Sequence, residues 1–299
     1  MRYPTVKQLR YFVALCELRH FGRAAEASFV SQSAFSTAIQ DLERLLGTPL
    51  VDRTNRRVTI TAAGQEVAAR ARLCLRELED LVEFAGQCRL PLCGSLRLGV
   101  IPTIAPFLLP RALPKLRKTY PDLKLYLTED RTDRIHQRLL DGDLDLLLLA
   151  LPFELRGVEE MPLFRDRFLL AFREGSGRVD AGHYQFSRLD PDSILLLEDG
   201  HCLREHALAA CKIRGSDKVS RFAATSILTL VEMVDADLGI TYLPEMAQDS
   251  ALLRNTKVKL LPIGDNSYRT IGLAWRKASG RAEEFRLLGD FLKSHAPPL

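Results

Sequence analysis

The chain has 299 residues, of which 46% are hydrophobic and 27% charged, and its net charge is +4. This composition is typical of a globular protein and excludes a disordered or fibrous one, and the length predicts two or three domains. No apolar run approaches the roughly 20 residues of a membrane-spanning helix, and charged residues interrupt the start of the chain where a signal peptide would be apolar. We therefore expect a cytoplasmic protein without membrane contact.

Positive charge is concentrated at the N-terminal end. Residues 1–60 carry nine Lys and Arg against five Asp and Glu, and this excess equals that of the whole chain. Because phosphate neutralisation supplies most non-specific affinity for nucleic acid, a basic end on a neutral body favours DNA binding there. The six cysteines do not suggest a secreted disulfide framework, so we expect thiols unless one pair serves redox chemistry.

The first part of the chain is predicted to be helical. An amphipathic helix over 5–19, a short Ala-rich helix over 23–28 and a longer helix over 32–46 follow one another. Ser31 is placed to cap the third helix and Gly47 to end it. This order predicts a helix-turn-helix whose second helix enters the major groove of DNA. The short or amide side chains expected to meet base edges are Gln32, Ser33, Ser36, Thr37 and Gln40.

Residues 50–60 are predicted to form a β-wing of two short strands. Arg53, Arg56 and Arg57 would lie against the phosphate backbone and position the domain. Thr61 then caps a long helix, 62–86, which carries one apolar stripe. Such a helix needs a partner. The same helix of a second subunit is the simplest, and packing on its own C-terminal domain is the alternative.

The stretch AAEASFVSQSAFSTAIQDLERLLGTPLVDRTNRRVTITAAG resembles the DNA-binding domain of LysR-type transcriptional regulators almost continuously. It combines the helix-turn-helix, the wing and the TxAG-capped linker helix at that family's spacings. Ser33 departs from the proline that is usual there, which bears on the operator preference. The resemblance implies double-stranded promoter DNA and RNA polymerase as partners, and a homodimer through the linker helix that assembles into a homotetramer.

The remainder of the chain alternates between strand-like and helical patterns. The predicted strands are 95–101, 123–129, 144–149, 168–172, 194–198, 219–223, 239–243 and 270–275. The alternation predicts an α/β domain with largely parallel sheets, and the resemblance implies two lobes like those of periplasmic binding proteins. Thr103, Thr132 and Thr225–Ser226 stand at strand-to-helix junctions. Each alone is read as a helix cap, but their grouping favours a ligand cleft between the lobes.

The segment LEDGHCLREHALAAC places two cysteines at the ends of a helix-prone stretch. Cys202 would lie in the first helical turn, where the helix dipole favours a thiolate, and His201 and Arg204 add nearby charge or hydrogen-bond donors. These conditions lower a thiol pKa, and the thiolate is the form that peroxide oxidises. A helix from Cys202 to Cys211 would rise about 13 Å, whereas a disulfide needs Cα atoms within about 7 Å. A disulfide would therefore force the segment to unwind, which makes a switch.

Without context, two cysteines nine residues apart are more often unrelated buried thiols. Here the segment closely resembles the sensor loop of the peroxide-sensing LysR-type regulators, and the similarity continues through IPTIAPFLLP, RFAATSILTLVEMV, GITYLP and YRTIGLAWR. It implies that Cys202 is the peroxidatic cysteine and Cys211 the resolving one. The side chains implied to bind peroxide or to activate the thiolate are Thr103, Thr132, His201, Arg204 and Arg269. Glu205 and Asp237 replace a usual Asp and a usual small residue, which bears on rate and sensitivity.

The other cysteines have a different interpretation. Cys16 and Cys74 fall on apolar helix faces, where they are expected to pack. Cys88 and Cys93 flank a hinge at Pro91. We expect them to be linker thiols, since nothing nearby activates them, and a hinge disulfide is the alternative.

The sequence thus predicts a winged helix-turn-helix over 1–60, a linker helix and hinge over 61–93, and a bilobal redox-sensing regulatory domain over 94–299. The expected function is a LysR-type activator of antioxidant genes that responds to hydrogen peroxide and needs neither metal nor other cofactor. One alternative is a LysR-type regulator that binds a small metabolite between the lobes. The other is an enzyme, a thiol peroxidase, for which the sequence offers no reductant site.

Overall fold

The computed structural model describes residues 3–54, 57–85, 91–180, 184–210, 217–277 and 279–296. Contacts between Cα atoms divide the chain into two compact units. One consists of Met1–Arg89 with Leu140–Asp143, and the other of Leu90–Leu139 with Leu144–Leu299.

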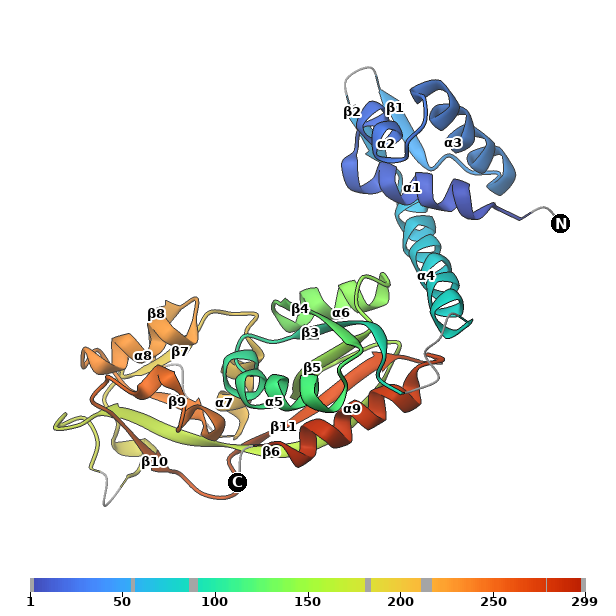
Figure 1. Cartoon of the computed structure of the whole chain (residues 1–299). Coiled ribbons are helices and arrows are strands. Elements are labelled where there is room, and N and C mark those ends of the chain that lie inside the picture. Colours follow the sequence, from blue (N-terminus) through green and yellow to red (C-terminus); the bar gives the residue numbers. More distant parts are fainter. Residues whose placement is uncertain are drawn as a thin grey trace. The chain divides into compact units, whose positions relative to one another are not determined.

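The N-terminal unit contains the predicted helix-turn-helix and wing (Figure 1). Its elements are α1 (Val6–Leu18), α2 (Phe21–Ala27), α3 (Gln32–Leu46), and the antiparallel pair β1 (Val51–Thr54) and β2 (Arg57–Ile60). The ends of α3 confirm the sequence prediction. The Ser31 hydroxyl accepts the Ala34 amide at 3.3 Å, and Gly47 takes a left-handed φ of 69°. The face of α3 that is buried in the core consists of Phe35, Ile39 and Leu42.

The linker helix α4 (Ala62–Ala85) begins where the TxAG pattern predicts. The Thr61 hydroxyl accepts a hydrogen bond from the Gly64 amide at 2.9 Å, which caps the first turn. A Cβ atom on Gly64 would collide with the Leu50 carbonyl oxygen, so the last position of the pattern requires glycine. The pattern therefore fixes both the start of α4 and its close approach to the wing.

The C-terminal unit is built on a mixed sheet. Its strands are β3 (Gly94–Val100), β4 (Leu123–Glu129), β5 (Leu146–Leu151), β6 (Val158–Arg173), β9 (Thr241–Pro244), β10 (Val258–Pro262) and β11 (Tyr268–Arg276). Their order is β10-β6-β11-β5-β3-β4, with β9 paired to β6. A separate parallel pair joins β7 (Ile194–Leu197) to β8 (Val219–Ala224). All of β5 is buried, so the core of the unit lies at the centre of the sheet.

The prediction of largely parallel sheets is wrong for part of this unit. β3 pairs in parallel with β4 and β5, but every pairing of β6 and of β11 is antiparallel. β6 is also far longer than the predicted 168–172, and β10 was not predicted. The part of β6 before the predicted strand, VEEMPLFRDR, carries five charged residues and a proline, which hide its strand character when only the sequence is read.

Helices cover the sheet of the C-terminal unit. They are α5 (Ala105–Thr119), α6 (Thr132–Leu140), α7 (Cys202–Ala210), α8 (Ile227–Asp235) and α9 (Ala282–Ser294), with single 3-10 turns at Phe186–Arg188, Glu245–Ala247 and Ala251–Leu253. Figure 1 shows β6 and β11 running from the part that holds β3–β5 to the part that holds α7, α8, β7 and β8. This confirms two lobes joined by long strands. One apolar cluster continues through both lobes and includes Cys202.

Candidate functional site

The recognition helix α3 presents polar side chains on the face away from the core. Gln32, Ser33, Thr37 and Gln40 are exposed, and Ser36 is half-buried. Two of the hydroxyls already have partners, since Thr37 donates to the Ser33 carbonyl at 3.0 Å and Ser33 shares a contact of 3.1 Å with Ser31. Arg53 and Arg57 fall on the paired strands of the wing, and Arg56 lies outside the described residues.

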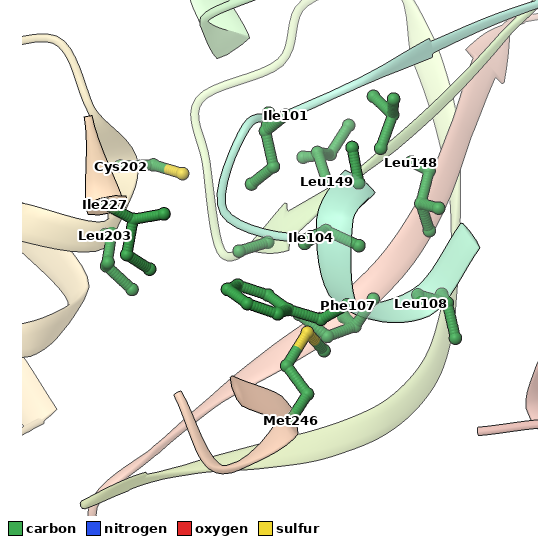
Figure 2. Packing of buried hydrophobic residues seen from close by; sticks show 14 of the residues in the cluster. Ile101, Ile104, Phe107, Leu108, Leu148, Leu149, Cys202, Leu203, Ile227 and Met246 are labelled. Atoms are coloured by element: carbon green, nitrogen blue, oxygen red, sulfur yellow. The ribbon is translucent and has the colours of Figure 1, made fainter. Parts of the chain in front are cut away.

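The second candidate site centres on Cys202, the first residue of α7. Its thiol is free and its side chain is 4% exposed. Figure 2 shows the side chain among apolar neighbours, with the sulfur directed toward the side of Ile101 and away from Leu203. Burial raises the pKa of Cys202, which reverses the lowered pKa predicted from the helix start and the nearby cations. The physical reason is that the apolar packing removes water from the sulfur.

A buried cation works against this effect of burial. Arg269 lies on β11 and lowers the pKa of Cys202 through its charge. Its guanidinium donates to the Asp166 carboxylate at 2.9 Å, to the Thr103 hydroxyl at 2.9 Å and to the Thr103 carbonyl at 2.8 Å. The side chains of Arg269 and Asp166 are both 0% exposed. Because three acceptors fix it in place, the guanidinium is a preorganised positive charge near the sulfur.

Asp166 is the partner that makes this buried cation possible. Its second carboxylate oxygen accepts the Met246 amide at 3.1 Å. Burial raises the pKa of the Asp166 carboxyl, and the charge of Arg269 together with the Met246 amide opposes that rise. An ion pair at this depth is held only by such additional hydrogen bonds. Sequence reasoning missed Asp166 because it lies in the part of β6 that was not predicted as a strand.

Thr132, the first residue of α6, completes the surroundings of the sulfur. Its hydroxyl lowers the pKa of Cys202 as a hydrogen-bond donor. Thr132 Oγ1 is buried and makes no full hydrogen bond within the described part of the chain. The hydroxyl therefore retains the capacity to bind a small polar molecule beside Cys202.

His201 lines a neighbouring cavity of about 470 Å³ together with Thr103. Burial lowers the pKa of His201, and the nearby charge of Arg131 lowers it further. Thr225 and Ser226 also line this cavity, and the Ser226 hydroxyl caps α8 by accepting the Thr229 amide at 3.1 Å. Of the predicted junction residues, Thr103, Thr225 and Ser226 thus line one cleft, whereas Thr132 is not among its lining residues. The helix-cap interpretation also holds for Ser226.

Arg204 and Asp237 have hydrogen-bond partners of their own, whereas Glu205 raises the pKa of Cys202 through its charge. Arg204 pairs with the Asp199 carboxylate at 2.9 Å and donates to the Leu197 carbonyl at 3.3 Å, so it ties the first turn of α7 to β7. Asp237 accepts from the Ser176 hydroxyl at 2.7 Å and from Arg178. The replacement of the usual small residue by Asp237 therefore adds contacts with Ser176 and Arg178.

The other cysteines correct one expectation. Cys74 is exposed in the single chain, on the α4 stripe that is predicted to meet a second subunit, whereas Cys16 is partly buried, and burial raises the pKa of Cys16 to about 11. Cys93 is disulfide-bonded, not a linker thiol, and its partner lies outside the described residues. Cys88 and Cys211 also lie outside the described residues. Only Cys202 among the described thiols stands beside a buried cation.

Two further properties concern the described residues as a whole. No helix among them combines the length and the apolar character needed to cross a membrane. Within the same ranges, no group of three or more His, Cys, Asp or Glu side chains is arranged to hold a metal ion.

Comparison with known proteins identifies both units. Residues 6–65 match the model of the bacterial regulatory helix-turn-helix protein, lysR family, and residues 90–297 match the LysR substrate binding domain. The HTH-type transcriptional regulator EstR of Acinetobacter baylyi is 41% identical over 97% of this chain and 96% of its own length. The DNA-binding transcriptional dual regulator OxyR of Escherichia coli is 39% identical over 97% of this chain and 95% of its own.

Solved structures agree with this similarity. A full-length OxyR variant from Pseudomonas aeruginosa is 30% identical, covers 99% of this chain and 97% of its own, and superposes with a TM-score of 0.78. The reduced regulatory domain of OxyR2 from Vibrio vulnificus is 39% identical, covers 71% of this chain and all of its own, and has a TM-score of 0.67. The chain therefore belongs to the LysR family of bacterial transcriptional regulators, and it is an OxyR-like member of that family.

Proposed function

We propose that this regulator senses hydrogen peroxide through Cys202 and is switched by a disulfide between Cys202 and Cys211, so that it activates antioxidant genes. The observation that carries the proposal is the buried thiol of Cys202 beside the fixed guanidinium of Arg269. The buried, unsatisfied hydroxyl of Thr132 supports it further. A buried cation stabilises a thiolate, and the free hydroxyl offers a hydrogen bond to a peroxide oxygen.

In the first step the Cys202 thiol gives up its proton and the thiolate sulfur attacks one oxygen of hydrogen peroxide. The O–O bond breaks, and the leaving hydroxide takes up the proton and departs as water, which leaves Cys202 as a sulfenic acid. In the second step the sulfur of Cys211 attacks the Cys202 sulfur and a second water leaves. Two electrons pass from the two thiols to the peroxide. Arg269 is expected to stabilise the anionic sulfur in the first step, and Thr132, Thr103 and His201 are expected to bind the peroxide.

The geometry of α7 supports a conformational consequence of the second step. α7 spans nine residues, Cys202 to Ala210, in the form with a free Cys202. Its axial rise is about 12 Å, and Cys211 follows it in the sequence, whereas a disulfide needs Cα atoms within about 7 Å. The helix therefore has to unwind before the disulfide closes. We infer that this rearrangement is the signal that passes to the rest of the regulator.

We further propose that α3 reads promoter DNA with Gln32, Ser33, Ser36, Thr37 and Gln40, and that Arg53, Arg56 and Arg57 contact phosphates.

The linker helix leaves Leu78, Leu81 and Val82 exposed at 38%, 60% and 69% on one face. A second copy of α4 would cover them. We propose a dimer on this face and a tetramer of two dimers, which acts in the cytoplasm with RNA polymerase. We also propose that residues 1–60 bind DNA, that residues 61–93 form the linker helix and hinge, and that residues 94–299 form the redox-sensing domain.

The cavity lined by His201 and Thr103 favours a second candidate function, a LysR-type regulator that responds to a small metabolite. Its volume of about 470 Å³ suits a small organic molecule. Under that alternative both cysteines are incidental, and Cys202→Ser keeps the full transcriptional response. We do not propose an enzyme. Sustained peroxide turnover with a thiol reductant at ordinary enzyme rates would support a thiol peroxidase instead.

The decisive experiment is peptide mapping by mass spectrometry after a brief micromolar pulse of hydrogen peroxide, with free thiols blocked. We expect a Cys202–Cys211 disulfide within seconds, while Cys16 and Cys74 stay reduced. Cys202→Ser is expected to abolish the response of a promoter reporter to peroxide without loss of DNA binding. A Cys202 that stays reduced, or that oxidises no faster than Cys74, would refute the redox function and direct attention to the cavity.

A further inference from the structure

His206 lies in the middle of α7 and contacts a distant strand end. It follows Cys202 by four residues, so the two side chains share a face of the helix with Cβ atoms about 5–6 Å apart. Its Nε2 atom lies 3.0 Å from the carbonyl oxygen of Pro152, the residue after β5. The charge of Arg269 lowers the pKa of both Cys202 and His206. His206 therefore connects the reactive helix to the lobe that holds β5.

The chemistry of this contact fixes the state of the imidazole ring. A proline carbonyl only accepts hydrogen bonds, so Nε2 carries the hydrogen and donates it to Pro152. Burial lowers the pKa of His206, the charge of Arg269 lowers it further, and the bond to Pro152 opposes both. The ring is therefore neutral near pH 7, with Nδ1 as an acceptor. Nδ1 is buried and has no hydrogen-bond partner in the part of the chain that the structure describes.

α7 depends on such contacts because it is short. A helix of nine residues is marginal by itself and needs tertiary packing. Its buried residues are Cys202, Leu203 and Ala207, which present little apolar surface. Other hydrogen bonds hold its two ends, from Arg204 to the Leu197 carbonyl and from Ser267 to the Ala210 carbonyl at 3.2 Å. Among the side-chain hydrogen bonds of the described residues, the bond from His206 holds its middle.

We propose that His206 is a positioning residue that holds α7 in its helical arrangement and thereby sets the rate of the second redox step. Its bond to Pro152 has to break when α7 unwinds toward Cys211, so the bond slows disulfide formation. It does not slow the attack of the Cys202 sulfur on peroxide, which needs no unwinding. Nδ1 has no partner among the described residues, so a single hydrogen bond, from Nε2, holds the ring. This one bond restrains the helix but does not prevent it from unwinding. This role rests on the proposed function, since it presupposes the Cys202–Cys211 disulfide.

The first test measures the restraint itself and needs no redox chemistry. Hydrogen exchange of the α7 amides is followed by mass spectrometry in the reduced full-length protein. We expect His206→Phe, which keeps the bulk and removes the donor, to exchange about fivefold faster, as the loss of one hydrogen bond predicts. His206→Gln, whose amide can still donate, is expected to stay close to the wild type.

His136 provides a matched control. It lies in α6, and its Nε2 atom is 3.1 Å from the Arg156 carbonyl oxygen, so it makes the same kind of bond from a different helix. His136→Phe is expected to leave exchange in α7 unchanged. Fluorescence of the single tryptophan, Trp275, reports whether each variant is folded. Unchanged exchange in folded His206→Phe overturns the proposal, whatever the redox chemistry does.

The second test separates the two redox steps. After a peroxide pulse, the Cys202 sulfenic acid is trapped with a dimedone reagent, and the disulfide is quantified over time. We expect His206→Phe to form sulfenic acid at the wild-type rate and the disulfide about fivefold faster. An unchanged second step with faster exchange refutes the kinetic role of His206. If the wild-type chain forms no Cys202–Cys211 disulfide, the proposed function fails, and the exchange experiment still decides whether the bond restrains α7.

Discussion

Two helices of this regulator, α3 and α7, are stabilised in opposite ways. α3 has fifteen residues, a serine cap at its start, a left-handed glycine at its end, and Phe35, Ile39 and Leu42 buried beneath it. α7 has nine residues and buries a cysteine, a leucine and an alanine. Its fixed contacts come instead from single hydrogen bonds of Arg204, His206 and Ser267. The first helix is stable through its own sequence and its large apolar face, and the second through contacts made elsewhere.

This difference matches what each helix is proposed to do. A recognition helix has to keep one shape when it meets DNA, so its caps and core are local and redundant. A switch helix has to change shape after one covalent event, and segments that move are drawn from the low-stability parts of a fold. Around Cys202, the ion pair of Arg269 and Asp166 is held by several hydrogen bonds, whereas α7, the helix that we propose unwinds, is held by few.

The largest expected effect concerns the rigid part of the redox site. Arg269→Met leaves the Asp166 carboxylate buried and unpaired, and such a loss costs about 3–5 kcal/mol. The free energy of unfolding of the reduced protein, measured with urea, is expected to fall by that amount. Oxidation of Cys202 should also slow, because the thiolate loses its neighbouring cation.

The double variant Arg269→Met with Asp166→Leu is the control for this prediction. It removes both charges, so much of the lost stability should return while the slow oxidation remains. A double variant as unstable as the single one would mean that the pair is needed for the packing of β6 against β11, not for its charge balance.

The next prediction compares the two helices directly. Leu42→Ala in α3 removes a fully buried side chain, so the N-terminal unit is expected to lose about 2–5 kcal/mol of stability. Leu203→Ala in α7 removes one of the few buried contacts of that helix and should make α7 amides exchange faster. Operator affinity should fall only for the first variant, and Cys202 chemistry should change only for the second. Parallel losses in both assays would contradict the independence of the two helices.

The same contrast explains how far the sequence alone could lead. The bounds of α3 were predictable because Ser31 and Gly47 are local signals, and the TxAG pattern likewise located the start of α4. The proposed role of Cys202 came from resemblance and from its place at a helix start. Its raised pKa was not predictable, because burial depends on the apolar packing of a complete domain.

Long-range partners were the part that sequence reasoning missed. Asp166 and Arg269 are 103 residues apart, and His206 and Pro152 are 54 residues apart. Neither pair leaves a local pattern, since an acid in a charged strand and a histidine in a short helix are ordinary. The alternation of charge in β6 concealed that strand for the same reason, because only its pairing with β11 shows which of its residues are buried.

The pH dependence of oxidation tests the electrostatics of the thiol. Because burial raises the pKa of Cys202, the thiolate is the minor form at neutral pH. Below the pKa its fraction grows about tenfold for each pH unit, and the oxidation rate should grow with it. Stopped-flow measurements between pH 6 and pH 9 would establish the slope, with Cys16, whose pKa burial raises to about 11, as a second buried thiol in the same chain. A rate that stays flat below pH 8 would mean that Arg269 outweighs burial.

The smallest expected effect concerns the cap of α3. Ser31→Ala removes the hydroxyl that accepts the Ala34 amide, and the loss of such a cap costs about 1 kcal/mol, whereas glycine costs only a few tenths. Urea unfolding of the two variants should therefore differ, and fluorescence anisotropy with a promoter duplex should give weaker binding for Ser31→Ala, because the first turn of the recognition helix frays. Peroxide oxidation of Cys202 should be the same in both variants. Equal losses for alanine and glycine would mean that Ser31 acts through its contact with Ser33 or with DNA, so that α3, like α7, relies on partners beyond its own first turn.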